Sequence, residues 1–133
     1  MVHQLSPDQL REVYRWVDQV PLSRPKKNIS RDFADGVLIA EMIHYFTPHL
    51  VELHNYSATN SVKQKLYNWE TVNKKILKHL DITLSRDLLN GVSESKKGYI
   101  ETVLYNVRTA LEKYRQSSHN KSSSHNRSNN SSF

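Results

Sequence analysis

Four stretches of the sequence place apolar residues three or four positions apart, which is the spacing of one face of an α-helix. They lie at residues 10–20, 33–46, 66–80 and 100–114. Segments that alternate apolar and polar residues, as half-buried strands do, are nearly absent. Such a chain buries its apolar residues most readily between packed helices. We therefore predict an all-α, compact multi-helix fold with about four main helices plus short ones.

The first helix has a clear start and a clear end. Ser6 can cap it, Pro7 suits the first helical position, and Gln9 completes a capping box. Pro21 should end it, because proline lacks the backbone N–H that would continue the hydrogen-bond ladder. Trp16 lies beside the apolar stripe of this helix, so we expect it to be a core residue rather than a ligand platform.

A second helix is expected from about Ser30 to Pro48, and it is apolar around most of its circumference. This pattern is typical of a central, buried helix. Gly36 lies inside the predicted helix, where glycine costs about 1 kcal/mol relative to alanine. Close packing of the backbone against another helix is a physical reason to tolerate it.

The remaining helices follow an irregular connection over residues 48–60. A third long helix is expected from the cap at Ser61 to about residue 80, with Trp69 as a second core anchor. A short helix should cover residues 86–90 and stop at Gly91. The last helix is expected from residue 95 or 98 to about 115.

Composition supports one domain followed by a polar tail. We assign residues 1–116 to the domain and expect the Ser/Asn-rich residues 117–133 to be disordered, because they cannot bury enough apolar surface to order themselves. The sequence has no cysteine, which excludes disulfide frameworks. No signal peptide and no membrane span are evident, so we expect an intracellular protein without membrane partners.

No pattern typical of catalysis or metal binding stands out. His44, His49 and His54 recur every five residues, which is not a same-face helical spacing, and we expect no metal site. Asp32 and Asp35 are interpreted as first-turn carboxylates that complement a helix dipole. No nucleophile elbow or glycine-rich phosphate loop is present. We expect no catalytic residues, no cofactor and no enzymatic activity.

The positive charge is the feature that indicates a partner. The formal net charge is +6, which suits an acidic partner. A first basic cluster lies on a connection stiffened by Pro21 and Pro25, and it comprises Arg24, Lys26, Lys27 and Arg31. A second cluster lies on the third helix and comprises Lys63, Lys65, Lys74, Lys75 and Lys78. A stiff loop loses less conformational entropy on docking, so the charges that it carries contribute more to binding. The alternative is an ordinary solvated surface, which for the second cluster is equally supported.

The segments also resemble a known family. The order is a helix, a basic loop, RDFADGVLIAEMI, an irregular connection, LYNWETVNKKILKHL and a terminal helix, and it is similar to a calponin-homology domain. Two longer segments, WVDQVPLSRPKKNISRDFADGV and HNY…NSVKQKLYNW, resemble the sperm-flagellar-protein (CLAMP) branch of that family. The resemblance covers about residues 5–115.

The resemblance implies a calponin-homology fold and a module that binds and bundles microtubules in the cytoplasmic cytoskeleton of cilia and flagella, especially the axoneme and its central apparatus. Tubulin is acidic, so we expect Arg24, Lys26, Lys27 and Arg31 to be primary contacts and Lys63, Lys65, Lys74 and Lys75 secondary ones. Members usually carry a longer C-terminal coiled coil that supports dimerisation. No heptad pattern occurs in these residues, so we expect no coiled-coil dimer from them.

Two other partners are compatible with the positive charge. Actin filaments are also acidic and bind many calponin-homology domains, although tight actin binders commonly use two such domains in tandem. Nucleic acid is permitted by net charge alone. No helix-turn-helix spacing or aromatic platform for bases is evident, so we do not expect it.

Overall fold

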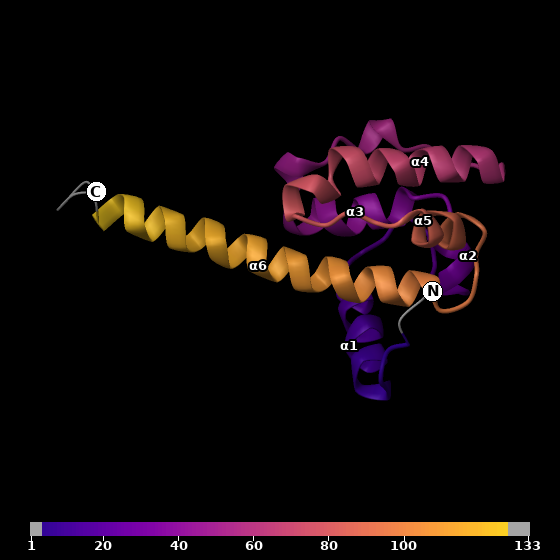
Figure 1. Cartoon of the computed structure of the whole chain (residues 1–133), viewed down its shortest axis with the longest axis horizontal. Helices are drawn as coiled ribbons and strands as arrows, with labels where there is room; N and C mark the ends of the chain where they lie inside the picture. Colours follow the sequence, from indigo (N-terminus) through magenta and orange to yellow (C-terminus); the bar gives the residue numbers. More distant parts are fainter. Residues whose placement is uncertain (1–3, 128–133) are drawn as a thin grey trace.

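The computed structural model describes residues 4–127 of the chain, and side chains from residue 4 to residue 117. Within that range every regular element is a helix, which confirms the predicted all-α class (Figure 1). The α-helices are α1 Pro7–Asp18, α2 Ile29–Asp32, α3 Val37–Phe46, α4 Val62–Lys75, α5 Arg86–Ser93 and α6 Tyr99–Arg127. Three short 3-10 helices join them: η1 Pro48–Leu50, η2 Leu53–Asn55 and η3 Leu77–Leu80.

Helix α1 begins where the capping pattern predicts. The Ser6 hydroxyl accepts a hydrogen bond from the Gln9 N–H at 3.1 Å, and the Gln9 side chain accepts one from the Ser6 N–H at 2.8 Å. This reciprocal pair is a capping box, and it satisfies two backbone donors that a helix start leaves without partners. Trp16 is buried, as expected.

The predicted second helix is in fact two helices. α2 ends at Asp32, and α3 starts at Val37, after a turn. Gly36 causes the break, because its φ of +79° is left-handed and incompatible with helix interior. A Cβ at Gly36 would lie 3.2 Å from the Asn68 Cβ of α4. The expected close approach to another helix is therefore correct, but it occurs at a turn.

Three other helix ends differ from the prediction. The third helix stops at Lys75 and is followed by the tighter turn η3. α5 continues past Gly91 to Ser93, and the hydrogen atom of Gly91 faces the Tyr99 ring, which a Cβ would overlap. Glycine therefore serves close packing at this position, and it does not stop the helix.

Helix α6 also runs further than predicted, because it ends at Arg127 rather than near residue 115. The segment from Tyr99 to Arg127 contains no glycine or proline, so nothing in it forces a helix to stop. The predicted disorder from Ser117 onward stays a prediction. Residues 128–133 lie outside the described residues, and the division into domain and tail stays a prediction.

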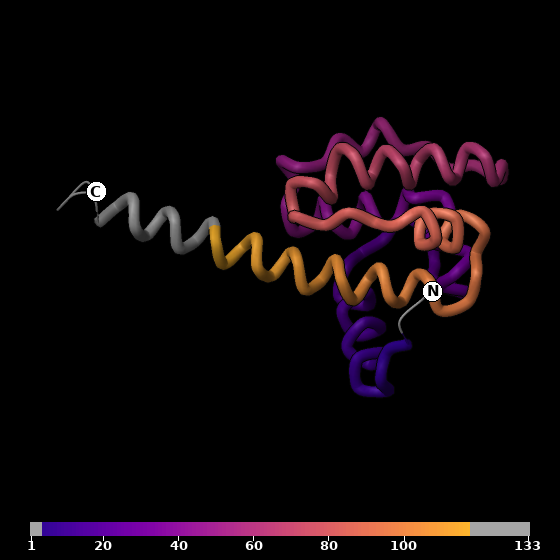
Figure 2. The backbone as a smooth tube through the Cα atoms, in the orientation of Figure 1, coloured from indigo at the N-terminus to yellow at the C-terminus, as the bar shows by residue number. Residues whose placement is uncertain are grey.

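Helix α6 crosses the body of the molecule. It contacts α1 on one side and α5 and α3 on the other, and Figures 1 and 2 show α1 and the α3–α4 layer on opposite sides of it. Buried apolar residues from α1, α3, α4, α5 and α6 form one core. Trp69 and Phe33 are completely buried in it. At one end of the body, α2, α5 and the beginning of α6 come together (Figure 1).

Tyr56 makes the stability of this fold depend on pH at the alkaline end. Burial, and secondarily the Glu52 carboxylate, raise the pKa of Tyr56 to about 12. An unfolded chain has a tyrosine pKa of about 10. The folded state therefore favours the neutral phenol. The contribution of the Tyr56 phenol to the free energy of unfolding is fully present below pH 10, and it is lost as the pH rises from 10 to 12.

We expect Tyr56→Phe to reduce the loss of stability over this range, because phenylalanine cannot ionise. Urea unfolding followed by circular dichroism at pH 9, 10 and 11 measures the slope. Some slope should remain, because burial and the hydrogen bond to Glu101 also raise the pKa of Tyr14 to about 12. Identical slopes in wild type and variant would show that Tyr56 is not responsible.

Candidate functional site

A hollow of about 350 Å³ lies at the end of the body where α2, the start of α4 and the α5–α6 loop meet. We call it the cationic hollow. Four cations line it: Arg24, Lys27, Arg31 and Lys65. Three come from the first predicted basic cluster and Lys65 from the second, so the fold joins residues that are far apart in sequence.

Two carboxylates also line the cationic hollow, and the protein's own donors occupy both of them. Arg24 makes a two-pronged contact with the buried Asp35, at 3.3 and 3.4 Å. The Asp35 carboxylate also accepts the backbone N–H groups of Val37 at 3.1 Å and Thr59 at 3.4 Å. Asp32 accepts the backbone N–H groups of Lys27 and Asn28. These acids therefore hold the loops in place.

The consecutive residues Asn68 and Trp69 of α4 fix the shape of the hollow. The Asn68 amide donates to the backbone oxygen of Asp35 at 2.9 Å and to that of Ser57 at 3.0 Å. The Trp69 indole N–H donates to the backbone oxygens of Phe33 and Ala34. These bonds clamp α4 to the α2–α3 turn, and so they hold Lys65 against the α2 side of the hollow.

Three cations of the hollow remain available to a partner. Within the part of the chain that the structure describes, the side chains of Lys27, Arg31 and Lys65 form no ion pair or hydrogen bond. Lys27 and Arg31 are exposed, and Lys65 is half-buried. Converging cations without internal partners suit a carboxylate-rich surface, since each can form a charge-assisted hydrogen bond.

The other predicted contacts lie elsewhere. Arg24 is tied to Asp35, and it also donates to the backbone oxygen of Asp32 at 2.9 Å. Lys26 pairs with Asp18 at 3.3 Å. Lys63, Lys74 and Lys75 are exposed but do not line the hollow. Along α4, Lys74 lies about 14 Å beyond Lys65, at 1.5 Å per residue.

Sequence reasoning missed the uncharged residues of the hollow. Thr59, Asn60 and Ser95 line it, and they come from two connections without any motif. Asp35 is predicted to lie in the first turn of a helix, but it precedes Gly36, the N-cap of α3, and its carboxylate accepts the Val37 N–H from there. Its pairing with Arg24 could not be seen, because the two residues meet only through the path of the loop.

Comparisons with known proteins decide the family. A family model described as "CH-like domain in sperm protein" matches residues 13–109, which is more than half of the chain. The chain belongs to this family. The resemblance found in the sequence is thereby confirmed, and the helical architecture is consistent with the calponin-homology fold.

This CH-like domain also matches curated proteins. It is 45% identical to "Sperm flagellar protein 1" of Homo sapiens over 112 residues, which are 84% of this chain and 48% of that protein. It is 41% identical to the protein of the same name from Xenopus laevis over 119 residues, which are 90% of this chain and 52% of that protein. The chain thus spans about half the length of the curated relatives it matches.

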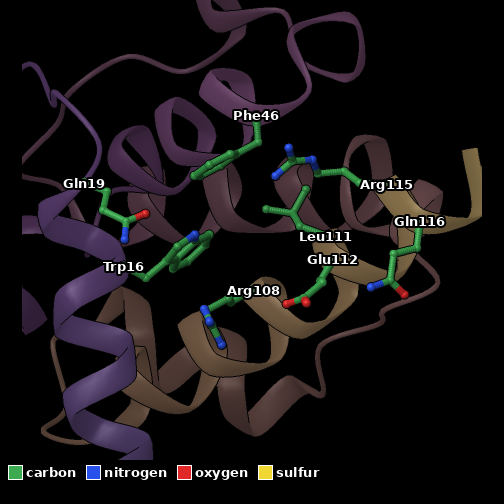
Figure 3. Close-up of a pocket in the computed structure, with 8 residues that line it drawn as sticks. All are labelled: Trp16, Gln19, Phe46, Arg108, Leu111, Glu112, Arg115 and Gln116. Carbon is green, nitrogen blue, oxygen red and sulfur yellow. The ribbon is translucent and has the colours of Figure 1, made fainter. Parts of the chain in front are cut away.

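A second hollow of about 720 Å³ lies between α1, the end of α3 and α6 of the CH-like domain (Figure 3). Trp16 and Phe46 stack with their ring centroids 5.7 Å apart, and the Arg115 guanidinium lies 5.7 Å from the Phe46 centroid. At its edge Arg108 pairs with Glu12 at 3.8 Å. These contacts join three helices, so the residues of this hollow have a structural role in packing α1, α3 and α6 together.

Two histidines of the CH-like domain contact neighbouring side chains. His49 contacts the Tyr114 hydroxyl at 3.0 Å, and His54 lies 3.7 Å from Glu52. No group of three or more metal-binding side chains occurs among the described residues. Over the same residues, no helix has the length and apolar character required to cross a lipid bilayer.

Proposed function

We propose that this CH-like domain binds microtubules and that it docks the cationic hollow on their acidic surface. The observation that carries the proposal is the convergence of Lys27, Arg31 and Lys65, whose side chains have no ion-pair or hydrogen-bond partner among the described residues. The family and the flagellar names of the relatives support a cytoskeletal role in cilia or flagella. We extend this to an axonemal microtubule, because the filaments of flagella are built from tubulin.

Two cations of the first basic cluster are engaged within the fold. Arg24 stabilises the fold, because its guanidinium pairs with the Asp35 carboxylate. Lys26 is partly engaged by Asp18. The three remaining cations of the hollow should dominate, and Lys63, Lys74 and Lys75 should act mainly through long-range attraction. Each exposed charge pair is worth only about 0–1 kcal/mol, so several must act together.

Co-sedimentation with microtubules and with actin filaments, side by side over a salt series, tests the partner. We expect the protein to pellet with microtubules at low salt and to be released as salt rises, since the screening length is about 8 Å at physiological ionic strength. Protein that stays in the supernatant at low salt would contradict the proposal. Pelleting with actin alone would identify the other filament as the partner.

The hollow itself is tested by two matched triple variants. Lys27→Gln, Arg31→Gln and Lys65→Gln together should weaken microtubule binding on the order of 10- to 100-fold, because three exposed pairs are lost at once. The control combines Lys74→Gln, Lys75→Gln and Lys78→Gln, which changes net charge equally at the far end of α4 and in η3.

The control should weaken binding by less than about threefold, because these charges act only through screened, long-range attraction. Equal losses in both variants would mean that net charge alone drives binding, which would exclude the hollow as the docking site. Circular dichroism should show the same unfolding midpoint for both variants, since none of the six side chains makes an ion pair within the described residues.

A further inference from the structure

The loop between α5 and α6 brings Ser95 to the edge of the cationic hollow. Ser95 has a φ of +60°, in the left-handed region that favours glycine or asparagine. Backbone hydrogen bonds hold the loop in this form, from the Ser95 N–H to the Val92 oxygen and from the Lys96 N–H to the Gly91 oxygen. Ser95 therefore has a backbone conformation in which a glycine would be less strained.

The Ser95 hydroxyl has no hydrogen-bond partner in the part of the chain that the structure describes. Ser93, two residues earlier, is buried and donates to the Asn90 backbone oxygen, so its hydroxyl is occupied. Ser95 is partly exposed, and its neighbours Glu94, Lys96 and Lys97 are exposed. An enzyme approaching this loop would therefore find the Ser95 hydroxyl available and the Ser93 hydroxyl enclosed.

The charge around Ser95 matches the charge of a phosphate group. The four cations and two carboxylates of the hollow leave a net charge of +2. A phosphoserine carries about −1.5 to −2 charges at pH 7 and has three acceptor oxygens. A phosphate on Ser95 would therefore neutralise the hollow and could accept hydrogen bonds from the same cations that we assign to the filament.

We propose that Ser95 is a phosphorylation site, and that its phosphate occupies the cationic hollow and blocks docking on the filament. The blocking part rests on the proposed function, whereas occupation of the hollow does not. In the transfer, the Ser95 oxygen attacks the γ-phosphorus of a nucleoside triphosphate that a protein kinase supplies. The bond from that phosphorus to the β–γ bridging oxygen breaks, the nucleoside diphosphate leaves, and the hydroxyl proton passes to a base of the kinase.

Occupation of the hollow can be measured without any filament. Phosphoserine incorporated during expression places the phosphate on Ser95 alone in the full chain. Nearby cations favour the dianion, so phosphorus NMR should find its second pKa below the ordinary value of about 6. The matched control is phosphorylated Ser117, an exposed serine on α6 that does not line the hollow. Adding Arg31→Gln and Lys65→Gln should raise the pKa of phosphorylated Ser95 toward that of the control.

Blocking is measured by co-sedimentation with microtubules. Phosphorylated Ser95 should weaken binding on the order of tenfold or more, because the contacts of three exposed pairs are lost together. Phosphorylated Ser117 should change it by less than about threefold. Ser95→Gly should have an unfolding midpoint at least as high as that of the wild type, because glycine suits a φ of +60°.

The outcomes separate this proposal from the proposed function. Equal phosphate pKa values at Ser95 and Ser117 would overturn occupation of the hollow, whatever the protein binds. A lowered pKa with undiminished pelleting would overturn blocking. If the unmodified chain fails to pellet, the proposed function is wrong, while a lowered pKa still supports occupation of the hollow. Phosphate on Ser95 in protein isolated from its own cells would support natural use of the site, and phosphate on other serines alone would count against it.

Discussion

Trp69→Ala is expected to lower the free energy of unfolding by about 3–5 kcal/mol, which is a large part of the 5–15 kcal/mol that stabilises a typical domain. Trp69 is completely buried, so the substitution leaves a cavity in the core. It also removes the indole N–H that bonds to the backbone oxygens of Phe33 and Ala34. Urea unfolding followed by circular dichroism measures the loss.

The matched control is Tyr67→Ala, two residues earlier on the same helix. Tyr67 is 60% exposed, so its removal should change stability by no more than about 0.5 kcal/mol. Trp69→Phe should lie between the two, because it keeps most of the ring and loses the hydrogen bonds. A loss below about 1 kcal/mol for Trp69→Ala would mean that α4 is not anchored in this way.

The second large effect is expected from Arg24→Met, which should cost about 3 kcal/mol. The substitution keeps a long apolar stem and leaves the Asp35 carboxylate buried without its cation. Breaking a buried pair from one side typically costs about 3–5 kcal/mol, and we expect the lower end because Arg24 retains contact with water. Chemical unfolding of Arg24→Met beside Arg31→Gln measures the difference, and Arg31→Gln should be close to wild type.

A double-mutant cycle identifies the cause. Asp35→Asn combined with Arg24→Met should cost less than the sum of the two single substitutions, because the neutral amide no longer needs a cation. Strict additivity would show that the pair contributes nothing specific. If Arg24→Met retained full stability and lost filament binding, Arg24 would be a contact residue, as the sequence first indicated.

Local patterns in the sequence were sufficient for the helices but not for all their boundaries. The capping box at Ser6 and the periodic apolar residues act within a few positions, so they predicted α1 correctly. The apolar pattern places Gly36 inside a helix, because a left-handed φ is not visible in such a pattern. The sequence predicts that Gly91 stops a helix, because the Tyr99 ring, which requires a small residue there, packs against Gly91 only in the fold.

In the candidate site, the individual charges were predictable from the sequence, but their arrangement was not. Both basic clusters were visible as charges along the chain, and Lys27, Arg31 and Lys65 were among the predicted contacts. Their convergence was not predictable, because it depends on the bonds of Asn68 and Trp69 to the α2–α3 turn. Arg24, Lys26 and Lys27 are equivalent as cations in the sequence. In the fold, Arg24 pairs with Asp35 and Lys26 pairs with Asp18, whereas Lys27 forms no ion pair among the described residues.

The sequence alone was enough to predict the all-α class, the family resemblance and the positive charge. Periodicity and motifs depend on residues close together in the chain, and net charge depends only on composition. Tertiary structure decided which cations remain available, and it placed Ser95 among them. The physical reason is that an ion pair depends on the distance between side chains. For residues in separate loops, that distance exists only after the helices have packed.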